Sequence, residues 1–308
     1  MTNTLFDALM APHKGEARDF LILPDGSSLS YDDIHRLSGR LANLLTAQGV
    51  KPGDRVAVQV QKSPEALALY LATIRAGAVF LPLNTAYTPA EIAYFVGDAE
   101  PALVVCDPAR AARRDDFLPD GGKLMTLDAD GKGDLIEAAI CHAEVQNPVP
   151  RRGDDLAAIL YTSGTTGRSK GAMLSHDNLL SNARVLADAW RFTSEDVLLH
   201  ALPIFHTHGL FVASNVLMLA GGAMIWLPKF DAAQVTELLP RATSMMGVPT
   251  FYTRLLDRPD FTGELVQKMR LFTSGSAPLL AETHRAFEDR TGHRILERYG
   301  MTETNMNT

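Results

Sequence analysis

The stretch Tyr161-Thr162-Ser163-Gly164-Thr165-Thr166-Gly167-Arg168-Ser169-Lys170-Gly171 gathers three glycines and five hydroxyl residues into the ten positions 162–171. It follows an apolar run, 156–161, that reads as a strand, and it precedes a helical pattern over 175–190. Glycines let backbone N–H groups approach an anion closely, while hydroxyls and Lys170 add donors and charge. The stretch is not a Walker A loop, because Gly171 rather than Ser or Thr follows the lysine. It predicts a polyphosphate-binding loop between a strand and a helix.

Strand and helix patterns alternate on both sides of this loop. Helix starts are marked by Ser30 with Asp33, by Pro64 and by a Thr88–Glu91 capping box, and a helix is predicted over 64–76. The predicted strands are 56–60, 79–83, 103–106, 156–161, 197–201, 223–227 and 271–273. This order predicts an α/β fold with mainly parallel sheets covered by helices.

The domain organisation is predicted from interruptions in this alternation. Pro148, Pro150 and the charges after them predict a boundary near 148–154, which gives subdomains of roughly 1–150 and 151–308. The polar segment 110–132 is predicted to be an irregular surface excursion.

Composition narrows the class of protein. The 308 residues are 46% hydrophobic and carry a net charge of −7, which argues against nucleic acid and anionic membranes as partners. The two cysteines, Cys106 and Cys141, form no CxxC motif. The longest apolar run, 209–222, is too short to span a bilayer, and the first residues lack a signal-peptide pattern. We expect a cytoplasmic enzyme.

Four ordered motifs resemble the adenylate-forming superfamily of acyl-CoA synthetases, luciferases and peptide-synthetase adenylation domains. They are TSGTTGRSKG at 162–171, PIFHTHG at 203–209, SGSAPL at 274–279 and ERYGMTE at 297–303. The resemblance extends over essentially the whole chain. It implies the large N-terminal region of that fold and an ATP-dependent acid–CoA ligase.

The resemblance also implies site residues. Lys170, His206, Thr302 and Glu303 would be catalytic, with Glu303 as the Mg²⁺ contact and Thr302 on the α-phosphate. His206 would lie over the α-phosphate and the carboxylate, whereas His208 is expected to be structural. The implied ATP-binding residues are Thr162, Ser163, Gly164, Thr165, Thr166, Gly167, Lys170, Gly275, Ser276, Ala277, Tyr299, Gly300, Met301 and Thr302.

Two arginines adjoin motifs that border the acyl pocket in this superfamily. Arg254 lies in VPTFYTRLL at 248–256 and Arg298 precedes Tyr299; both stretches resemble malonyl-CoA synthetases. A bidentate guanidinium suits the distal carboxylate of a short diacid. His206, Arg254, Ser276 and Arg298 are therefore expected to bind substrate carboxylates, with malonate first and methylmalonate second. Arg254 is favoured over Arg298, because an extended strand places Arg298 and Tyr299 on opposite sides.

Several readings stay open at this point. Superfamily members carry a C-terminal domain with a catalytic lysine, which has no counterpart before Thr308, so the 308 residues are expected to be one part of a ligase and poorly active alone. The alternatives are another short-chain or aryl acyl-CoA ligase, an adenylation domain that loads a carrier protein, and a nucleotide-binding fragment without catalysis. ATP, Mg²⁺ and coenzyme A are the expected cofactor and co-substrates, and the C-terminal domain is the expected protein partner. The oligomeric state is left open.

Overall fold

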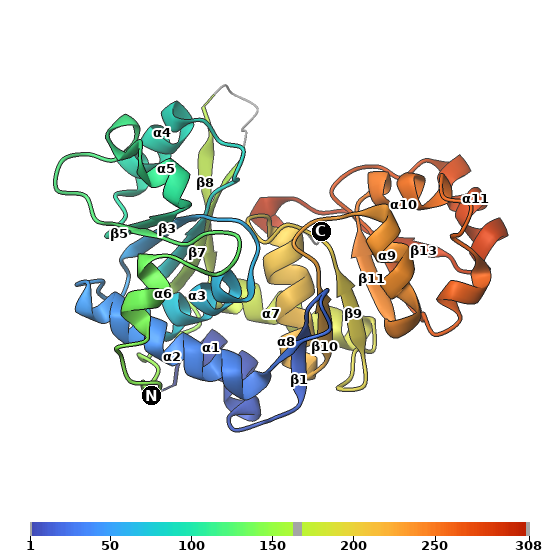
Figure 1. Ribbon diagram of the computed structural model, residues 1–308, viewed down its shortest axis with the longest axis horizontal. Helices are drawn as coiled ribbons and strands as arrows, with labels where there is room; N and C mark the ends of the chain where they lie inside the picture. Colours follow the sequence, from blue (N-terminus) through green and yellow to red (C-terminus); the bar gives the residue numbers. More distant parts are fainter. Residues whose placement is uncertain (1, 163–167, 306–308) are drawn as a thin grey trace. The chain divides into compact units, whose positions relative to one another are not determined.

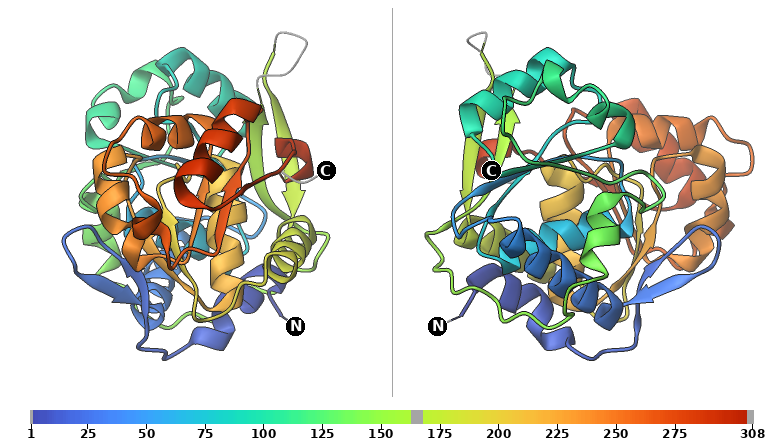
Figure 2. Two further views of the ribbon diagram at one scale, coloured as in Figure 1. Left: turned by 90° about the vertical axis from the view of Figure 1, so that its right-hand side faces the viewer. Right: turned by 60° about the vertical axis from the view of Figure 1, so that its left-hand side comes forward.

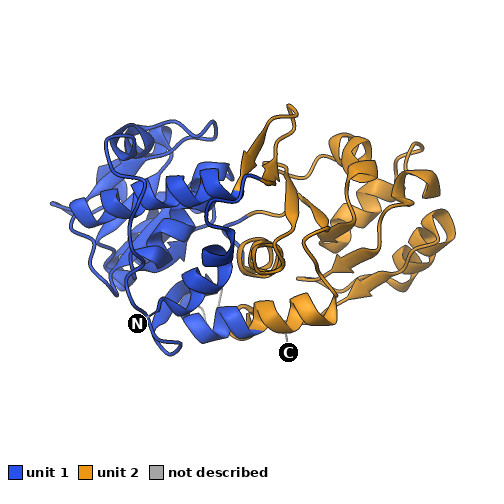
Figure 3. Cartoon of the chain, turned by 90° about the horizontal axis from the view of Figure 1, so that it is seen from below, with its two compact units in different colours: residues 1–17, 31–181, 204–206 blue, residues 18–30, 182–203, 207–308 orange. Residues whose placement is uncertain are grey.

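A computed structural model describes residues 2–162 and 168–305, which divide into two compact units. Unit 1 comprises residues 1–17, 31–181 and 204–206, and unit 2 comprises residues 18–30, 182–203 and 207–308 (Figure 3). The helix α7 (His176–Ala189) begins in unit 1 and ends in unit 2. Each unit is built on its own sheet.

Unit 1 contains a six-stranded sheet in the order β6-β5-β3-β4-β7-β8 (Figure 1). The pairs are parallel except β7 with β8. Its strands are β3 (Arg55–Gln59), β4 (Val79–Pro82), β5 (Leu103–Cys106), β6 (Leu124–Thr126), β7 (Leu156–Thr162) and β8 (Lys170–Ser175). Its other helices are α1 (Thr4–Met10), η1 (Ala11–His13), α2 (Tyr31–Ala47), α3 (Pro64–Arg75), α4 (Pro89–Ala99), α5 (Pro108–Ala111), η2 (Arg114–Asp116) and α6 (Asp134–Ala139).

Alternating side chains of the central strands pack against helices on both faces of this sheet. Ala57, Leu81 and Val104 join the cluster formed by α4 and the segment after α5. On the other face α3 is apolar all round, and its Tyr70 packs edge-on against Phe80. Helices on both faces explain why the strands read as continuous apolar runs. Figure 2 shows α4 and α5 together on one side of these strands.

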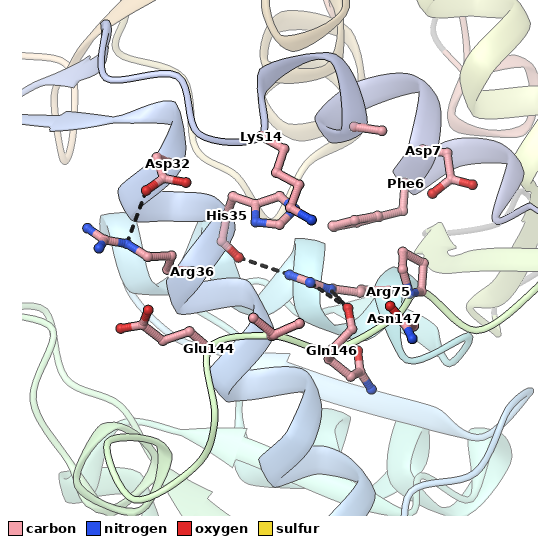
Figure 4. A pocket seen from close by; sticks show the side chains of 13 residues that line it. Phe6, Asp7, Lys14, Asp32, His35, Arg36, Arg75, Glu144, Gln146 and Asn147 are labelled. Carbon is pink, nitrogen blue, oxygen red and sulfur yellow. Dashed lines mark hydrogen bonds and ion pairs between the residues drawn. The ribbon is translucent and has the colours of Figure 1, made fainter.

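The proline-containing segment after α6 is held within unit 1 by arginines. Arg75 at the end of α3 donates to the carbonyls of Gln146 and His35 and to the Ser38 hydroxyl, and Arg40 pairs with Glu144 at 2.8 Å. His35, Arg75, Glu144 and Gln146 line a cavity of about 320 Å³, in which Figure 4 shows the Arg75 guanidinium beneath His35. Unit 1 therefore continues past residues 148–154, where the sequence placed a subdomain boundary, to residue 181.

Unit 2 contains a seven-stranded sheet in the order β13-β12-β11-β9-β10-β1-β2, parallel except for β1 with β2. The strands are β1 (Asp19–Ile22), β2 (Ser28–Ser30), β9 (Val197–His200), β10 (Ala223–Trp226), β11 (Ser244–Gly247), β12 (Leu271–Ser274) and β13 (Ile295–Glu297). The helices are the π-helix η3 (His208–Ser214), α8 (Asn215–Ala220), α9 (Ala232–Leu238), η4 (Leu239–Arg241), α10 (Pro249–Leu256), η5 (Gly263–Val266), α11 (Ala281–Thr291) and η6 (Thr302–Thr304). Aromatic contacts between α10, β12 and α11 fill its core, through Tyr252, Phe272 and Phe287.

The mainly parallel α/β fold predicted from the sequence is confirmed, with two local corrections. Residues 170–175 form strand β8, which pairs antiparallel with β7, so a strand precedes α7, which begins at His176. The segment 110–132 is not wholly irregular, because Leu124–Thr126 pairs with β5 as the edge strand β6. β6 and β8 were too short or too polar to show an apolar run. Four further strands that the structure describes, β1, β2, β11 and β13, were also not predicted from the sequence. Among the described residues, no helix combines the length and hydropathy that a bilayer crossing requires.

Candidate acyl and nucleotide site

A cavity of about 550 Å³ opens in unit 2 at the ends of two neighbouring parallel strands. Its walls come from the loop after β12 and from the segment after β13. The lining residues are Ser276, Ala277, Pro278, Glu297, Arg298, Tyr299 and Gly300. Ligands bind outside the carboxyl ends of strands in open α/β sheets, so this position suits a substrate site.

Arg298 supplies a largely buried cation to this cavity. Its backbone N–H donates to the Ser274 carbonyl at 2.9 Å, which continues the β12–β13 pairing for one residue. Burial lowers the pKa of its guanidinium to about 10, and Tyr252 acts in the opposite direction. The side chain passes so close to Gly275 that a Cβ there would lie 3.2 Å from it. Gly275 thus leaves room for the guanidinium.

Ser276 has an uncommon backbone conformation beside this arginine. Its φ of +71° lies in the left-handed region, which costs a non-glycine residue free energy and is found most often at functional sites. Its hydroxyl is 3.2 Å from Nδ1 of His208, a buried residue at the start of η3. The structural role expected for His208 from the sequence stays a prediction.

Glu297 is the carboxylate nearest to Arg298 in sequence, and its oxygens are engaged elsewhere. Oε1 accepts from the Leu279 N–H at 2.9 Å, and Oε2 lies 3.7 Å from Nε2 of His284. These contacts anchor the loop 275–280 to the end of β13.

Arg254 lies outside the cavity. It is exposed on α10, and its guanidinium stacks over the ring of Phe230 at 5.0 Å. Arg298 and not Arg254 lines the described cavity, so Arg298 is given the first place in the proposal below, and the role of Arg254 stays a prediction. The helical periodicity of α10 buries Tyr252 and Leu255, which turns Arg254 toward solvent.

The remaining predicted residues of unit 2 lie in the segment that follows β13. Tyr299 is 71% exposed and lines the cavity wall, while Met301 is 45% exposed. Thr302 and Glu303 lie on η6, with Glu303 exposed. The turn after η6 is fixed by Asn305, which accepts from the Thr207 hydroxyl at 2.8 Å and from Asn182 at 3.1 Å. The hydrogen bond between Thr207 and Asn305, which are both buried, connects motif 203–209 with the residues that follow motif 297–303.

The predicted site residues of unit 1 are those of segment 162–170 and His206. Ser163, Gly164, Thr165, Thr166 and Gly167 lie outside the described residues. Thr162 and Lys170 face each other as the last pair of the β7–β8 ladder, and Lys170 is exposed. The ladder is braced by Tyr161, whose hydroxyl donates to Asp98 at 2.5 Å, and by Tyr94, which donates to the Ser169 carbonyl at 2.8 Å. His206 is partly buried and clusters with unit 1, whereas Thr207 begins the next segment of unit 2.

The site offers little to hold a metal ion by itself. Within residues 2–162 and 168–305 no group of three His, Cys, Asp or Glu side chains converges. The exposed carboxylate of Glu303 is nevertheless the hard oxygen ligand that Mg²⁺ takes, and Mg²⁺ commonly uses one or two carboxylates with substrate phosphates for the rest. The residues present fit a magnesium ion that arrives with a nucleotide.

Comparison with known proteins defines the class. Residues 10–308 match the AMP-binding enzyme family, and the chain belongs to that family. This confirms the resemblance to adenylate-forming enzymes that the four motifs carried.

The individual relatives are ligases of different acids. Over its whole length the chain matches the crystal structure of MatB from Rhodopseudomonas palustris with a TM-score of 0.96 and 57% identity, covering 61% of that chain. A malonate–CoA ligase of Arabidopsis thaliana is 30% identical over 97% of this chain and 55% of its own length. A feruloyl-CoA synthase of an Amycolatopsis species is 33% identical over 96% and 58%. The chain thus spans little more than half the length of these relatives.

Proposed function

We propose that this chain is the N-terminal region of an AMP-forming acid–CoA ligase that converts malonate, with methylmalonate as a second acid, into its CoA thioester. The observation that carries the choice of acid is the buried guanidinium of Arg298 on the wall of the unit 2 cavity. Family membership and the relatives named for malonate support it.

The reaction has two steps. A carboxylate oxygen attacks the α-phosphorus of ATP, the bond to the bridging oxygen breaks and pyrophosphate leaves. The thiol of coenzyme A then attacks the acyl carbon, loses its proton and displaces AMP. Both steps bring anions together, so the protein's task is to position them and to offset their charge.

The resemblance to the adenylate-forming superfamily implies a role for each predicted site residue of this chain. Residues 162–170 bind the ATP phosphates, with Lys170 as their cation. The segments 275–277 and 299–301 hold the adenine, and Thr302 donates to the α-phosphate. His206 donates to the α-phosphate or to the reacting carboxylate, which an imidazole N–H can do. Glu303 binds Mg²⁺, which offsets phosphate charge when present.

Arg298 and Ser276 form the proposed recognition site for the second carboxylate of the diacid. A buried guanidinium gains a charge-assisted, bidentate partner from malonate and none from a monoacid of similar size. Sites built around a polar partner reject analogues that lack it by factors of about 10⁴, whereas apolar pockets discriminate one methylene by only about 10–200-fold.

The test compares kcat/KM for malonate, methylmalonate, propionate and octanoate in the wild type, Arg298→Met and Arg254→Met. We also propose that the chain works with a C-terminal domain of the same protein, so the assay uses the full-length enzyme. The wild type should prefer malonate to propionate by about 10³-fold or more. Arg298→Met should abolish most of that preference, and Arg254→Met, an exposed arginine, should leave it unchanged.

Other results of these assays would favour one of the alternative functions. A wild type that prefers octanoate or an aryl acid such as ferulate is not a malonate ligase, although it is still an acyl-CoA ligase. Transfer to a carrier protein but not to free coenzyme A would make it a loading domain. The absence of acid-dependent exchange of pyrophosphate into ATP would refute the adenylation chemistry itself. We keep a cytoplasmic location as part of the proposal, tested by fractionation of cells that express the native gene.

A further inference from the structure

Helix α4 contacts the backbone that directly precedes Lys170. The hydroxyl of Tyr94 on α4 donates to the Ser169 carbonyl at 2.8 Å, and the Arg168 guanidinium lies over the Tyr94 ring, 5.1 Å from its centroid. One side chain of the helix therefore holds two consecutive residues, which are followed in the sequence by the lysine. Tyr94 belongs to none of the four motifs, and the proposed reaction has not yet used it.

A second tyrosine connects the other strand of the ladder to the same helix. Tyr161 directly precedes Thr162, the ladder partner of Lys170, and its hydroxyl donates to Asp98 at 2.5 Å. A hydrogen bond to a carboxylate is stronger than one to a neutral acceptor. Asp98 lies four residues after Tyr94, which is one helical turn, so both contacts come from one face of α4. Burial, followed by the bond to Asp98, raises the pKa of the Tyr161 hydroxyl, which therefore stays protonated as a donor near neutral pH.

The helix that supplies these contacts is itself held at both ends. A capping box closes its first turn, and at its last turn Arg55 of β3 donates to the carbonyls of Ala99 and Glu100. Between the two ends Phe95, which is buried, packs against the ring of Tyr161 with the centroids 4.3 Å apart. In Figure 1 α4 lies beside β8. α4 is thus a fixed support against which the ends of β7 and β8 are held.

Strand β8 depends on such a support because it lies at the edge of its sheet, with β7 as its neighbour. Lys170 is the first residue of β8 and is exposed. A catalytic group has to be held within about 0.5 Å of its productive position, and a lysine at a fraying strand end would not meet that requirement. The hydrogen bonds from α4 restrain the backbone on either side of the ladder pair that contains this lysine.

We propose that Tyr94, Tyr161 and Asp98 are positioning residues for adenylation: they fix the start of β8 so that the ammonium of Lys170 meets the phosphates of ATP. The inference rests on the proposed function, which assigns the phosphates to Lys170. Neither tyrosine contacts ATP, and each acts through the backbone next to the lysine or next to its ladder partner. Misplacing a cation that offsets developing charge affects the rate of the chemical step more than substrate binding. Loss of these contacts therefore lowers kcat and leaves KM nearly unchanged.

Acid-dependent exchange of pyrophosphate into ATP by the full-length enzyme tests the proposal. Tyr94→Phe and Tyr161→Phe remove only the hydroxyls and should each lower kcat for exchange about 3–10-fold, the effect of one hydrogen bond, with KM for ATP changed less than about twofold. Asp98→Asn, which keeps an acceptor oxygen for Tyr161, should retain most of the rate. Asp98→Ala should reproduce Tyr161→Phe, and because Asp98 is exposed it keeps the test valid even if Tyr161→Phe unfolds.

Tyr87→Phe is the matched control. The ring of Tyr87 packs against Phe95, with the centroids 4.9 Å apart, in the same aromatic group. Its hydroxyl makes no hydrogen bond with any residue that the structure describes. Tyr87→Phe should leave kcat for exchange unchanged. An equal loss of kcat in this control would show that any change in the aromatic group lowers the rate, and would overturn the proposal.

A double-mutant cycle with Lys170→Ala separates positioning from a merely structural role. If the tyrosines act through the lysine, Tyr94→Phe should lower the exchange rate of the wild type but not that of Lys170→Ala. The same factor in both backgrounds, or an unchanged rate in Tyr94→Phe, Tyr161→Phe and Asp98→Ala, overturns the proposal. Exchange that is insensitive to Lys170→Ala overturns it too, and leaves the ligase assignment standing. The absence of exchange in the wild type refutes the proposed function itself, so the two failures are distinguishable.

Discussion

At the scale of single residues, two arginines with similar sequence arguments end in opposite environments. Arg298 is drawn into a cavity because Gly275 has no side chain to oppose it and because Glu297 turns toward Leu279. Arg254 stacks on Phe230 in solvent. In the proposed function, the guanidinium of Arg298 binds the second carboxylate of the diacid.

The prediction for a single residue concerns Glu303 and the Mg²⁺ requirement of the enzyme. Glu303→Gln should raise the Mg²⁺ concentration needed for half-maximal pyrophosphate exchange by about tenfold, because a neutral amide is a poorer ligand for a hard cation than a carboxylate. The measurement is a magnesium titration at fixed ATP. Glu264→Gln, on η5, is the matched control and should not shift the titration. An unchanged titration in Glu303→Gln would remove this residue from the proposed metal site.

At the scale of elements, the loop after β12 is fixed by side chains from neighbouring segments. Tyr252 on α10 donates to the Thr273 carbonyl at 2.6 Å, and His208 on η3 contacts the Ser276 hydroxyl at 3.2 Å. A π-helix is rare and often occurs at functional sites, and η3 brings His208 to this loop. The left-handed conformation of Ser276 therefore persists because surrounding contacts define it.

The contact between His208 and Ser276 predicts non-additive effects on stability. His208→Ala and Ser276→Ala should each lower the free energy of unfolding by about 1–2 kcal/mol, and the double variant should lose little more than either one. His208→Asn, which retains a side-chain nitrogen near the position of Nδ1, should recover part of the loss. Urea denaturation of the four proteins gives the coupling free energy. A coupling free energy near zero would show that the two side chains act independently.

At the scale of the whole chain, the structure depends on two buried neutral histidines of unit 1. His176 is fully buried, and its Nδ1 accepts from the Leu5 N–H at 3.3 Å, which requires that nitrogen to be unprotonated. Burial, followed by the charge of Arg151, lowers the pKa of His176 to about 4. Burial, followed by Arg75, lowers the pKa of His35 to about 4.

These pKa values predict acid sensitivity. Between pH 6.5 and 4 the unfolded chain binds protons that folded unit 1 does not bind, so the free energy of unfolding falls as the pH falls. The loss should approach about 3 kcal/mol per histidine at pH 4 and be absent above pH 7. Urea denaturation from pH 7.5 to 4.5 measures it. His176→Asn, which still offers an acceptor to Leu5, should show a shallower pH dependence, and a slope equal to that of the wild type would contradict the assignment.

The sequence alone determined the class of fold and the position of most strands, because local apolar runs and capping residues specify them. Thr88 with Glu91 forms the predicted capping box, and Val79 and Leu103 begin strands where expected. Motif residues such as Tyr299 and Ser276 were predicted as site residues because local sequence carries them, and both line the cavity of unit 2. Only the tertiary structure decided which arginine enters the cavity, where unit 1 ends and that segment 170–175 is a strand. Those outcomes depend on contacts between separate segments of the chain, namely Gly275 with Arg298, Arg75 with Gln146 and β7 with β8. The pattern of hydrophobic and polar residues along the chain does not record such contacts.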